Sequence, residues 1–403
     1  MKMSKKENYN HTMYACFTAY IVQGIVNNFA PLLFVMLQAE YGISLEKIGA
    51  LIMVNFGTQL AIDFASVFFV DHIGYRKSII IAHVCSALGF VGLTVLPDLS
   101  DDPFIGLLIS VVVYAIGGGL LEVLVSPVVE ACPNENKEKA MSLLHSFYCW
   151  GQVGVVFLST LFFSMAGIRH WKNITLIWVI VPVVNGIVFF RVPIRTFQEN
   201  GEKVMGGREL TKQKMFWLFM LLVMCVGACE HSVGQWASSF AEQGLGVSKS
   251  IGDLAGPMSF SAAMGLARVF YGKKGGQIRL EKFMALSSVM CILSYLMIAA
   301  VPSPAVSLLG CALCGLSVGI MWLGAFSMAA KIKGAGTAMF ALFALAGDLG
   351  CSIGPGVVGF VAENYQNNLH MGIGAALIFP IALVTVIIIV THSQRKNRMT
   401  VQL

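Results

Sequence analysis

Residues 104–130 read FIGLLISVVVYAIGGGLLEVLVSPVVE, an apolar run interrupted by two acids, Glu122 and Glu130. About 20 helical residues cross the hydrocarbon core of a bilayer, so this run is long enough to span a membrane. Backbone amides in hydrocarbon must form their hydrogen bonds within their own segment, so a run of this length is a helix rather than a strand. The stretch therefore predicts a membrane-spanning helix with an acid near its middle.

Similar apolar runs recur along the whole chain. Hydrophobic residues make up 57% of the 403 residues and charged residues only 12%, whereas a soluble domain carries roughly 25% charged residues, so a water-soluble globule is excluded. The first run has no cleavage site of small residues and is too long for a signal peptide, so we expect it to remain in the mature protein. The predicted fold is an all-α polytopic membrane protein, with twelve spans at 14–37, 45–70, 77–96, 104–130, 140–165, 173–192, 215–240, 251–271, 281–301, 304–330, 335–362 and 368–391.

The basic residues predict an orientation. Most of the 27 Lys and Arg residues precede the first span, lie in the even-to-odd connections, or follow the last span, whereas the opposite side holds Lys47, Arg169, Lys172 and Lys249. The positive-inside rule therefore places both termini in the cytoplasm. We attribute the net charge of +6 to this topology rather than to a nucleic-acid surface, and we expect the protein in a bacterial inner (plasma) membrane.

The spans divide six and six around a polar loop. We predict an N-terminal bundle at 1–192, a cytoplasmic linker at 193–214 and a C-terminal bundle at 215–403. The two halves align without reversal, which is typical of one class of secondary transporter that binds its substrate between the repeats. The matching motifs are Gly24-x-x-Asn27-Asn28 with Gly227-x-x-Glu230-His231, Ile48-Gly49 with Ile251-Gly252, Gly119-x-x-Glu122 with Gly319-x-x-Trp322, and Gly151-Gln152-x-Gly154 with Gly347-Asp348-x-Gly350.

The turn after the second span reads Asp71-His72-Ile73-Gly74-Tyr75-Arg76-Lys77. It resembles the signature between helices two and three of the major facilitator superfamily, although Val67 stands where that signature usually has Gly. The resemblance implies two pseudo-symmetric six-helix bundles and a cytoplasmic gate closed by charge contacts. The alternative is that these charges merely fix topology, which accounts for Lys77 better than for Asp71. We assign Asp63, Asp71, Arg76 and Arg268 to the gate.

Three acids lie near the middle of predicted spans: Glu122, Glu230 and Asp348. A charged side chain at the bilayer centre costs a few kcal/mol, so acids at such positions call for a functional explanation. In a partly dry cavity a carboxylate can bind a proton and release it when water reaches it. We therefore predict that these three acids couple transport to protons. The alternative is that each is permanently paired or inert.

Amide, imidazole and aromatic side chains accompany these acids in several spans. Amides with an aromatic platform suit a polyhydroxylated solute, which needs donors and acceptors on its edge and an apolar surface against its C–H face. The alternative is hydrogen bonding between helices. We predict substrate contacts from Gln23, Asn27, Asn28, Asn55, Gln59, Glu122, His145, Tyr148, Gln152, Glu230, His231, Gln235, Trp236 and Trp322.

Three motifs resemble the fucose permease branch of that superfamily. They are Gly117-Gly118-Gly119-Leu120-Leu121-Glu122 with Pro127, the pair Asn27-Asn28, and Gly227-Ala228-Cys229-Glu230 with Gly234-Gln235-Trp236. The likeness implies that Glu122 is a proton-coupled acid that contacts sugar. The chain departs from the branch at Pro31, which replaces an acid, and at Tyr148, which replaces Asn. These departures leave fucose itself and the proton stoichiometry open.

Other classes of function find no support in the sequence. The Gly-rich stretches 117–119, 315–319 and 347–359 lack the Lys-Ser/Thr of a phosphate loop, so we interpret them as sites of close helix packing. The pair Cys311 and Cys314 is interpreted as small residues in a helix interface, and the histidines have no metal-ligand spacing. We expect no enzyme activity and no cofactor.

The sequence thus predicts a monomeric secondary transporter in contact with lipid. It would take up a sugar or similar small polar solute with protons by alternating access. The alternative is a proton-coupled exporter of amphipathic compounds or metabolites. The aromatic and Met-rich spans would suit such a solute, as would the loss of the helix-one acid at Pro31.

Overall fold

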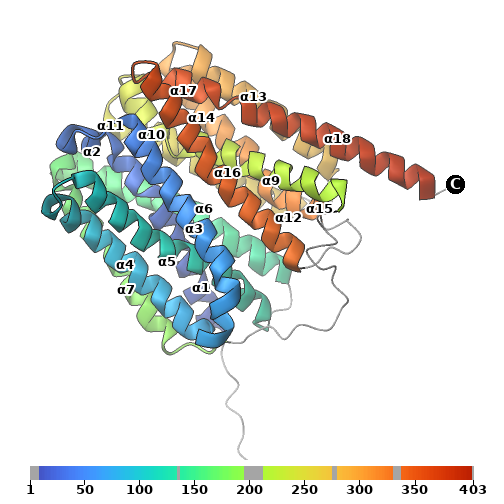
Figure 1. Ribbon diagram of the computed structural model, residues 1–403, viewed down its shortest axis with the longest axis horizontal. Coiled ribbons are helices and arrows are strands. Elements are labelled where there is room, and N and C mark those ends of the chain that lie inside the picture. Colours follow the sequence, from blue (N-terminus) through green and yellow to red (C-terminus); the bar gives the residue numbers. More distant parts are fainter. Residues whose placement is uncertain (1–8, 134–136, 195–211, 275–278, 330–336, 402–403) are drawn as a thin grey trace, which may run out of the picture. The chain divides into compact units, whose positions relative to one another are not determined.

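The computed structural model describes residues 9–133, 137–194, 212–274, 279–329 and 337–401, and these residues contain helices and no strand (Figure 1). The first half contains α1 (Asn10–Asn28), η1 (Ala30–Leu33), α2 (Phe34–Tyr41), α3 (Leu45–Ile73), α4 (Tyr75–Leu99), α5 (Pro103–Ala131), α6 (Lys137–Ala166), η2 (Ile168–His170) and α7 (Trp171–Phe189). The second half contains α9 (Lys214–Gly234), α10 (Ala237–Ser239), η3 (Phe240–Gly244), α11 (Lys249–Asp253), η4 (Leu254–Met258), α12 (Ser259–Lys274), α13 (Leu280–Ala300), α14 (Pro304–Val318), α15 (Met321–Ala329), α16 (Thr337–Asn364), α17 (Leu369–Ala375) and α18 (Ile378–Val401).

Eleven helical stretches in the described ranges are long and apolar enough to cross a membrane. They correspond to eleven of the twelve predicted spans, so the prediction of an all-α polytopic membrane protein is confirmed. The remaining predicted span, 251–271, is also helical, through α11, η4 and α12. It is less apolar because it contains Asp253 and Arg268.

The first span is broken, whereas the sequence predicted one continuous helix over 14–37. Helix α1 ends at Asn28, a 3₁₀ turn follows at Ala30–Leu33, and α2 then begins. Pro31 lacks a backbone N–H and so cannot continue the α-helical hydrogen bonds. The seventh span is broken at Gln235 and Trp236, close to the position that the repeat offset of the two halves gives.

The described residues pack as two compact units. The N-terminal unit contains residues 9–30 and 58–194, and the C-terminal unit contains residues 31–57 and 212–401. The predicted bundles assigned all of the first two spans to the N-terminal half, so segment 31–57 differs from that division. Most of the predicted linker, 193–214, lies outside the described residues.

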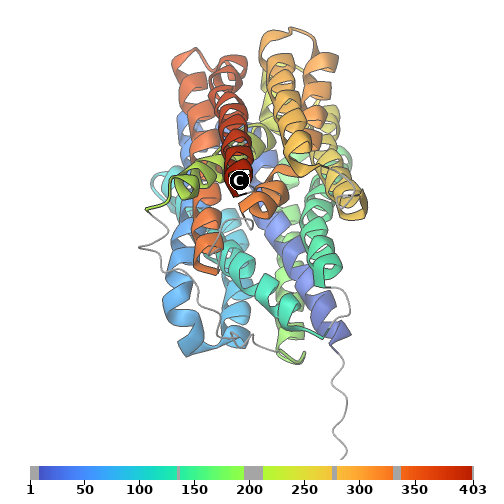
Figure 2. The same ribbon diagram turned by 90° about the vertical axis from the view of Figure 1, so that its right-hand side faces the viewer.

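Close helix contacts hold each unit together. Helix α4 packs along both α5 and α7 in the N-terminal unit (Figures 1 and 2), and α9 packs along α16 in the C-terminal unit. A Cβ atom at Gly117 would lie 2.5 Å from the carbonyl oxygen of Ala82, and one at Gly350 would lie 1.9 Å from that of Met224. These contacts confirm that the Gly-rich stretches serve close packing.

Segment 31–57 forms hydrogen bonds to the rest of the C-terminal unit at several positions along its length. The Gln243 side chain donates to Gln38 at 2.9 Å, and the Ser352 hydroxyl donates to the carbonyl oxygen of Met53, also at 2.9 Å. The backbone N–H of Glu46 donates to the Glu363 carboxylate at 3.0 Å, which satisfies an unpaired donor at the start of α3. The unit therefore includes the second half of the first span and the first half of the second.

Candidate functional site

The N-terminal unit contains a group of polar side chains between α1 and its neighbours, which we call the N-terminal polar cluster. Its members are Gln23, Asn27, Asn28, Gln59, Glu122 and Tyr148. Residues 23 and 27 are one turn apart and so share a face of α1. Their four amide members are at most 6% exposed. The sequence predicted all six as substrate contacts, and the structure brings them together in one bundle.

The shortest bond in this cluster joins an amide to an acid. The Gln23 Nε2 atom donates to the Glu122 Oε2 atom at 2.6 Å, from α1 to α5. Hydrogen bonds to a carboxylate are shorter and roughly twice as strong as bonds between neutral groups. The Glu122 side chain is only partly buried, so it retains some exposure although it is bonded to Gln23.

Two further amide contacts link α1 to α3 and α6. The Gln59 Nε2 atom donates to Asn27 Oδ1 at 2.8 Å, and the reverse contact is 3.5 Å. The Asn28 amide donates to the carbonyl oxygen of Gly24 at 2.9 Å and to the Tyr148 hydroxyl at 3.4 Å. Gly119 of α5 permits the approach of Gln59, because a Cβ atom there would lie 3.0 Å from the Gln59 Cα atom.

Other predicted residues of the N-terminal unit surround this cluster. The His145 ring meets the Tyr20 ring edge-on at 5.4 Å, and the Tyr20 hydroxyl lies 2.7 Å from that of Ser126 on α5. Gln152 is buried, and its side-chain oxygen has no hydrogen bond among the described residues. Asp63, predicted as a gate residue, is 9% exposed and lies beside Gly119.

The C-terminal unit contains a second group, the C-terminal polar cluster, formed by Glu230, His231 and Arg268. An Arg268 Nη atom lies 3.8 Å from the Glu230 carboxylate, and both side chains are buried. The Arg268 Nε atom donates to the carbonyl oxygen of Gly319 at 3.2 Å, where α14 ends. The sequence predicted Glu230 as a proton site and Arg268 as a gate residue without foreseeing their ion pair.

The predicted residues around the break in the seventh span occupy different environments. His231 packs its ring against Phe56 at 4.5 Å, with Nδ1 3.2 Å from the carbonyl oxygen of Gly227. The Trp236 side chain is fully buried, and its indole N–H donates to the carbonyl oxygen of Pro355 at 3.0 Å. Gln235 and Asn55 are buried as well.

Asp348 and Trp322 lie near the close contact of α16 with α15. Asp348 is 5% exposed. The neighbouring Gly347 packs directly on the Trp322 ring, since a Cβ atom at that glycine would lie 2.2 Å from it. The ring also stacks on Phe326 at a centroid distance of 5.8 Å.

Two predicted gate residues flank the connection between α3 and α4, Asp71 in the last turn of α3 and Arg76 in the first turn of α4. The Arg76 guanidinium donates to the carbonyl oxygens of Phe189 at 2.5 Å and Val192 at 2.8 Å, at the end of α7. It therefore satisfies the carbonyl group of Phe189, which the last turn of α7 leaves unpaired, and that of Val192, which follows the helix. Asp71 belongs to α3, but its side chain lies outside the described residues.

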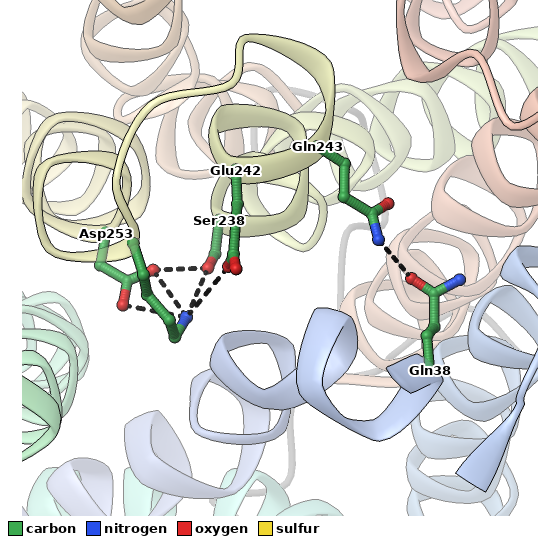
Figure 3. A network of polar contacts seen from close by, with 6 residues as sticks. Gln38, Ser238, Glu242, Gln243 and Asp253 are labelled. Carbon is green, nitrogen blue, oxygen red and sulfur yellow. Dashed lines mark hydrogen bonds and ion pairs between the residues drawn. The ribbon is translucent and has the colours of Figure 1, made fainter. Parts of the chain in front are cut away.

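Sequence reasoning missed one charged network, which Figure 3 shows at the start of the eighth predicted span. The Lys249 ammonium lies 3.1 Å from Asp253, 3.3 Å from the Ser238 hydroxyl and 3.8 Å from Glu242. Ser238 in turn donates to Asp253, which is buried, at 2.5 Å. The spacing of Lys249 and Asp253, four residues apart on a helix, is a signal that could have indicated this pair.

The described residues contain no group of three or more His, Cys, Asp or Glu side chains that could hold a metal ion. What they contain is a set of buried polar side chains within apolar helices. Polar residues inside membrane-spanning helices typically mark a path for a solute or an ion. Fold and polar clusters together define a polytopic membrane transporter.

Comparison with known proteins gives the family. Residues 14–355 match the Major Facilitator Superfamily, so the chain belongs to this family. A search of curated proteins finds no relative that matches the sequence.

Several solved structures share the fold at low identity. The E. coli fucose:proton symporter is 15% identical, with 95% of this chain and 99% of that chain covered and a TM-score of 0.66. A D-xylose-proton symporter is 13% identical, with 94% and 96% covered and a TM-score of 0.74. An inward-facing bacterial homologue of the human lysosomal transporter Spinster is 14% identical, with 98% and 99% covered and a TM-score of 0.77. At these identities the likeness establishes the fold, and it confirms the predicted major facilitator architecture.

Proposed function

We propose that this transporter takes up a sugar or a similar small polar solute together with protons, by alternating access. The bond between Gln23 and Glu122 is the observation that carries the proposal. It joins an acid that can bind a proton to an amide of the kind that recognises hydroxyl groups, within one cluster of membrane helices. Solved structures named as fucose:proton and xylose:proton symporters share the fold, which supports this choice of solute class.

Glu122 is the proposed proton site of the N-terminal unit, with Glu230 and Asp348 as further candidates in the C-terminal unit. The charged form of a carboxylate is less stable where water is partly excluded, so the group binds a proton there. It releases the proton when water reaches it. The Glu230 carboxylate lies 3.8 Å from the buried Arg268 guanidinium. Glu122 accepts a hydrogen bond from the Gln23 amide, so it is the acid chosen for the first test.

The proposed solute contacts are polar and aromatic side chains of the two clusters and of other positions in the same helices. Amides offer paired donors and acceptors to hydroxyl groups, and an aromatic face accepts the C–H side of a sugar ring. The proposed substrate-binding residues are Gln23, Asn27, Asn28, Asn55, Gln59, Glu122, His145, Tyr148, Gln152, Glu230, His231, Gln235, Trp236 and Trp322. We further propose a monomer in a bacterial inner membrane, with both termini in the cytoplasm.

Uptake into proteoliposomes tests this function. We expect labelled D-xylose or L-fucose to accumulate faster when the outside is made acidic, and we expect Glu122→Gln to abolish that acceleration. Glu130→Gln is the matched control, because Glu130 lies on the same helix but is exposed. Uptake that ignores the gradient, or that proceeds equally well in Glu122→Gln, would contradict the proposal.

A ligand screen narrows the solute. A compound that binds the folded state alone raises its apparent stability, so thermal unfolding can be compared across sugars, polyols, amino acids and nucleosides. We expect the sugars and polyols to give the largest shifts. Expulsion of an amphipathic dye without competition from any sugar would instead favour a proton-coupled exporter.

A further inference from the structure

Gln23 differs in its partner from the other amides that α1 contributes to the N-terminal polar cluster. Its described bond goes to a carboxylate, whereas the described bonds of Asn27 and Asn28 go to an amide, a backbone carbonyl and a phenol. The Gln23 side chain is 4% exposed, so surrounding atoms hold it in place. Its amide is therefore poised to respond to the charge of Glu122.

We propose that Gln23 is a positioning residue that sets how readily Glu122 binds a proton, and that it offers its N–H groups to the solute only when Glu122 is protonated. This inference rests on the proposed function, since it takes Glu122 as a proton site. It adds a physical link between the two transported species, the proton and the solute. Protonation of Glu122 frees the amide that the solute would bind, so the proton and the solute favour the same state of Gln23.

The chemistry of the two groups dictates this link. An ionised carboxylate has only acceptors, so it holds the Nε2 side of the Gln23 amide toward itself. A protonated carboxyl group becomes a donor on one oxygen, and Nε2 gains less by facing it. The new O–H can bond to Gln23 only if the amide turns over and presents Oε1. Both outcomes release the N–H groups for a hydroxyl of the solute.

The same bond favours the charged acid. Hydrogen bonds to the charged form of a group stabilise that form, so Gln23 makes Glu122 harder to protonate. Other titratable groups on the helices around this site include Tyr20 of α1, Tyr148 and His145 of α6, and Asp63 of α3. These groups remain in place when Gln23 alone is changed, so a comparison of variants isolates the contribution of the amide.

Infrared difference spectroscopy on the full-length protein in liposomes tests the proton part. The band of the protonated Glu122 carboxyl group is identified by its loss in Glu122→Gln and is titrated in the wild type and in Gln23→Met. Methionine keeps the length of the side chain but lacks the amide. We expect the midpoint of the titration to move by about one to two pH units toward higher pH. Gln59→Met is the matched control and should leave the midpoint unchanged, because the described partner of Gln59 is Asn27.

An unchanged midpoint in Gln23→Met would overturn the inference. If that variant does not fold, Gln23→Asn keeps the amide but draws it back by one methylene, and it should move the midpoint in the same direction. A wild-type Glu122 that never titrates would refute the proposed proton site itself. A wild-type titration that ignores Gln23 would refute only the inference, so the two failures are distinguishable.

Binding of D-xylose and L-fucose tests the solute part. In the wild type we expect tighter binding at acidic than at alkaline pH, and in Gln23→Met a dissociation constant that changes several-fold less with pH. The control Gln59→Met should weaken binding by the same factor at every pH. An undiminished pH dependence in Gln23→Met would overturn the link between proton and solute. The absence of binding to either sugar at any pH would contradict the solute class instead.

Discussion

Arg268 and Glu230 form an ion pair inside the C-terminal unit at 3.8 Å, a distance too long for a hydrogen bond. Both side chains are at most 10% exposed. Arg268 also donates to the carbonyl oxygen of Gly319, so it connects the acid on α9 to the end of α14. The guanidinium therefore neutralises a buried acid and satisfies a helix end at the same time.

This pair predicts strong coupling between two substitutions. Removing one partner of a buried pair leaves an uncompensated charge, so Arg268→Gln should lower the free energy of unfolding by about 3 kcal/mol. Glu230→Gln should be destabilising for the same reason. The double variant should lose less than the sum of the two, as measured by denaturant unfolding in mixed micelles. Strictly additive losses would mean that the two charges do not interact.

Trp236 predicts a structural effect at the break in the seventh span. Trp236→Phe removes the N–H that bonds to Pro355 and also reduces buried volume, so it should lower the free energy of unfolding by about 1–2 kcal/mol. Trp150→Phe is the matched control, because Trp150 is 43% exposed and should lose less than about 0.5 kcal/mol. Thermal unfolding of both variants in detergent measures the difference. Equal effects would show that the indole bond contributes nothing.

The fold follows from the sequence because the membrane leaves few alternatives. An apolar run such as 104–130 has to be a helix, and α5 at Pro103–Ala131 matches it almost to the residue. The break after Asn28 was missed, although Pro31 is its visible cause. The placement of segment 31–57 in the C-terminal unit depends on contacts between residues hundreds of positions apart, such as Gln38 with Gln243.

The candidate site follows from the sequence less completely. Polar residues in apolar spans are visible as exceptions, so Gln23 and Glu122 could be singled out. Their bond could not, because it depends on which faces of α1 and α5 meet. Arg268 shows the same limit, since its position was foreseen but its partner Glu230 lies 38 positions earlier in the chain and on another helix.

Close packing of α9 and α16 predicts a steric effect at Gly350. A Cβ atom there would lie 1.9 Å from the carbonyl oxygen of Met224, so Gly350→Ala forces the two helices apart. We expect a loss of about 2–3 kcal/mol, since overpacking of a core typically costs that much. Gly154→Ala is the control, because a Cβ atom at that helical position would have no described neighbour within 4 Å apart from the backbone of its own helix. It should be neutral or stabilising by up to about 1 kcal/mol, and a destabilised Gly154→Ala would argue against the packing account.

The sequence alone left two roles open for Arg76, one in the stability of the fold and one in a gate. Because Arg76 satisfies the carbonyl oxygens of Phe189 and Val192, we expect it to contribute to the stability of the N-terminal unit. Arg76→Ala should then lower the free energy of unfolding by about 1–3 kcal/mol, since these bonds come from a charged donor. Lys77→Ala, the adjacent exposed residue, serves as the control and should change it by less than about 0.5 kcal/mol. A residue that acts only in a gate would show the opposite pattern: Arg76→Ala would slow solute uptake into proteoliposomes while unfolding stayed at the wild-type midpoint. Measuring both quantities on the same two variants decides between the roles.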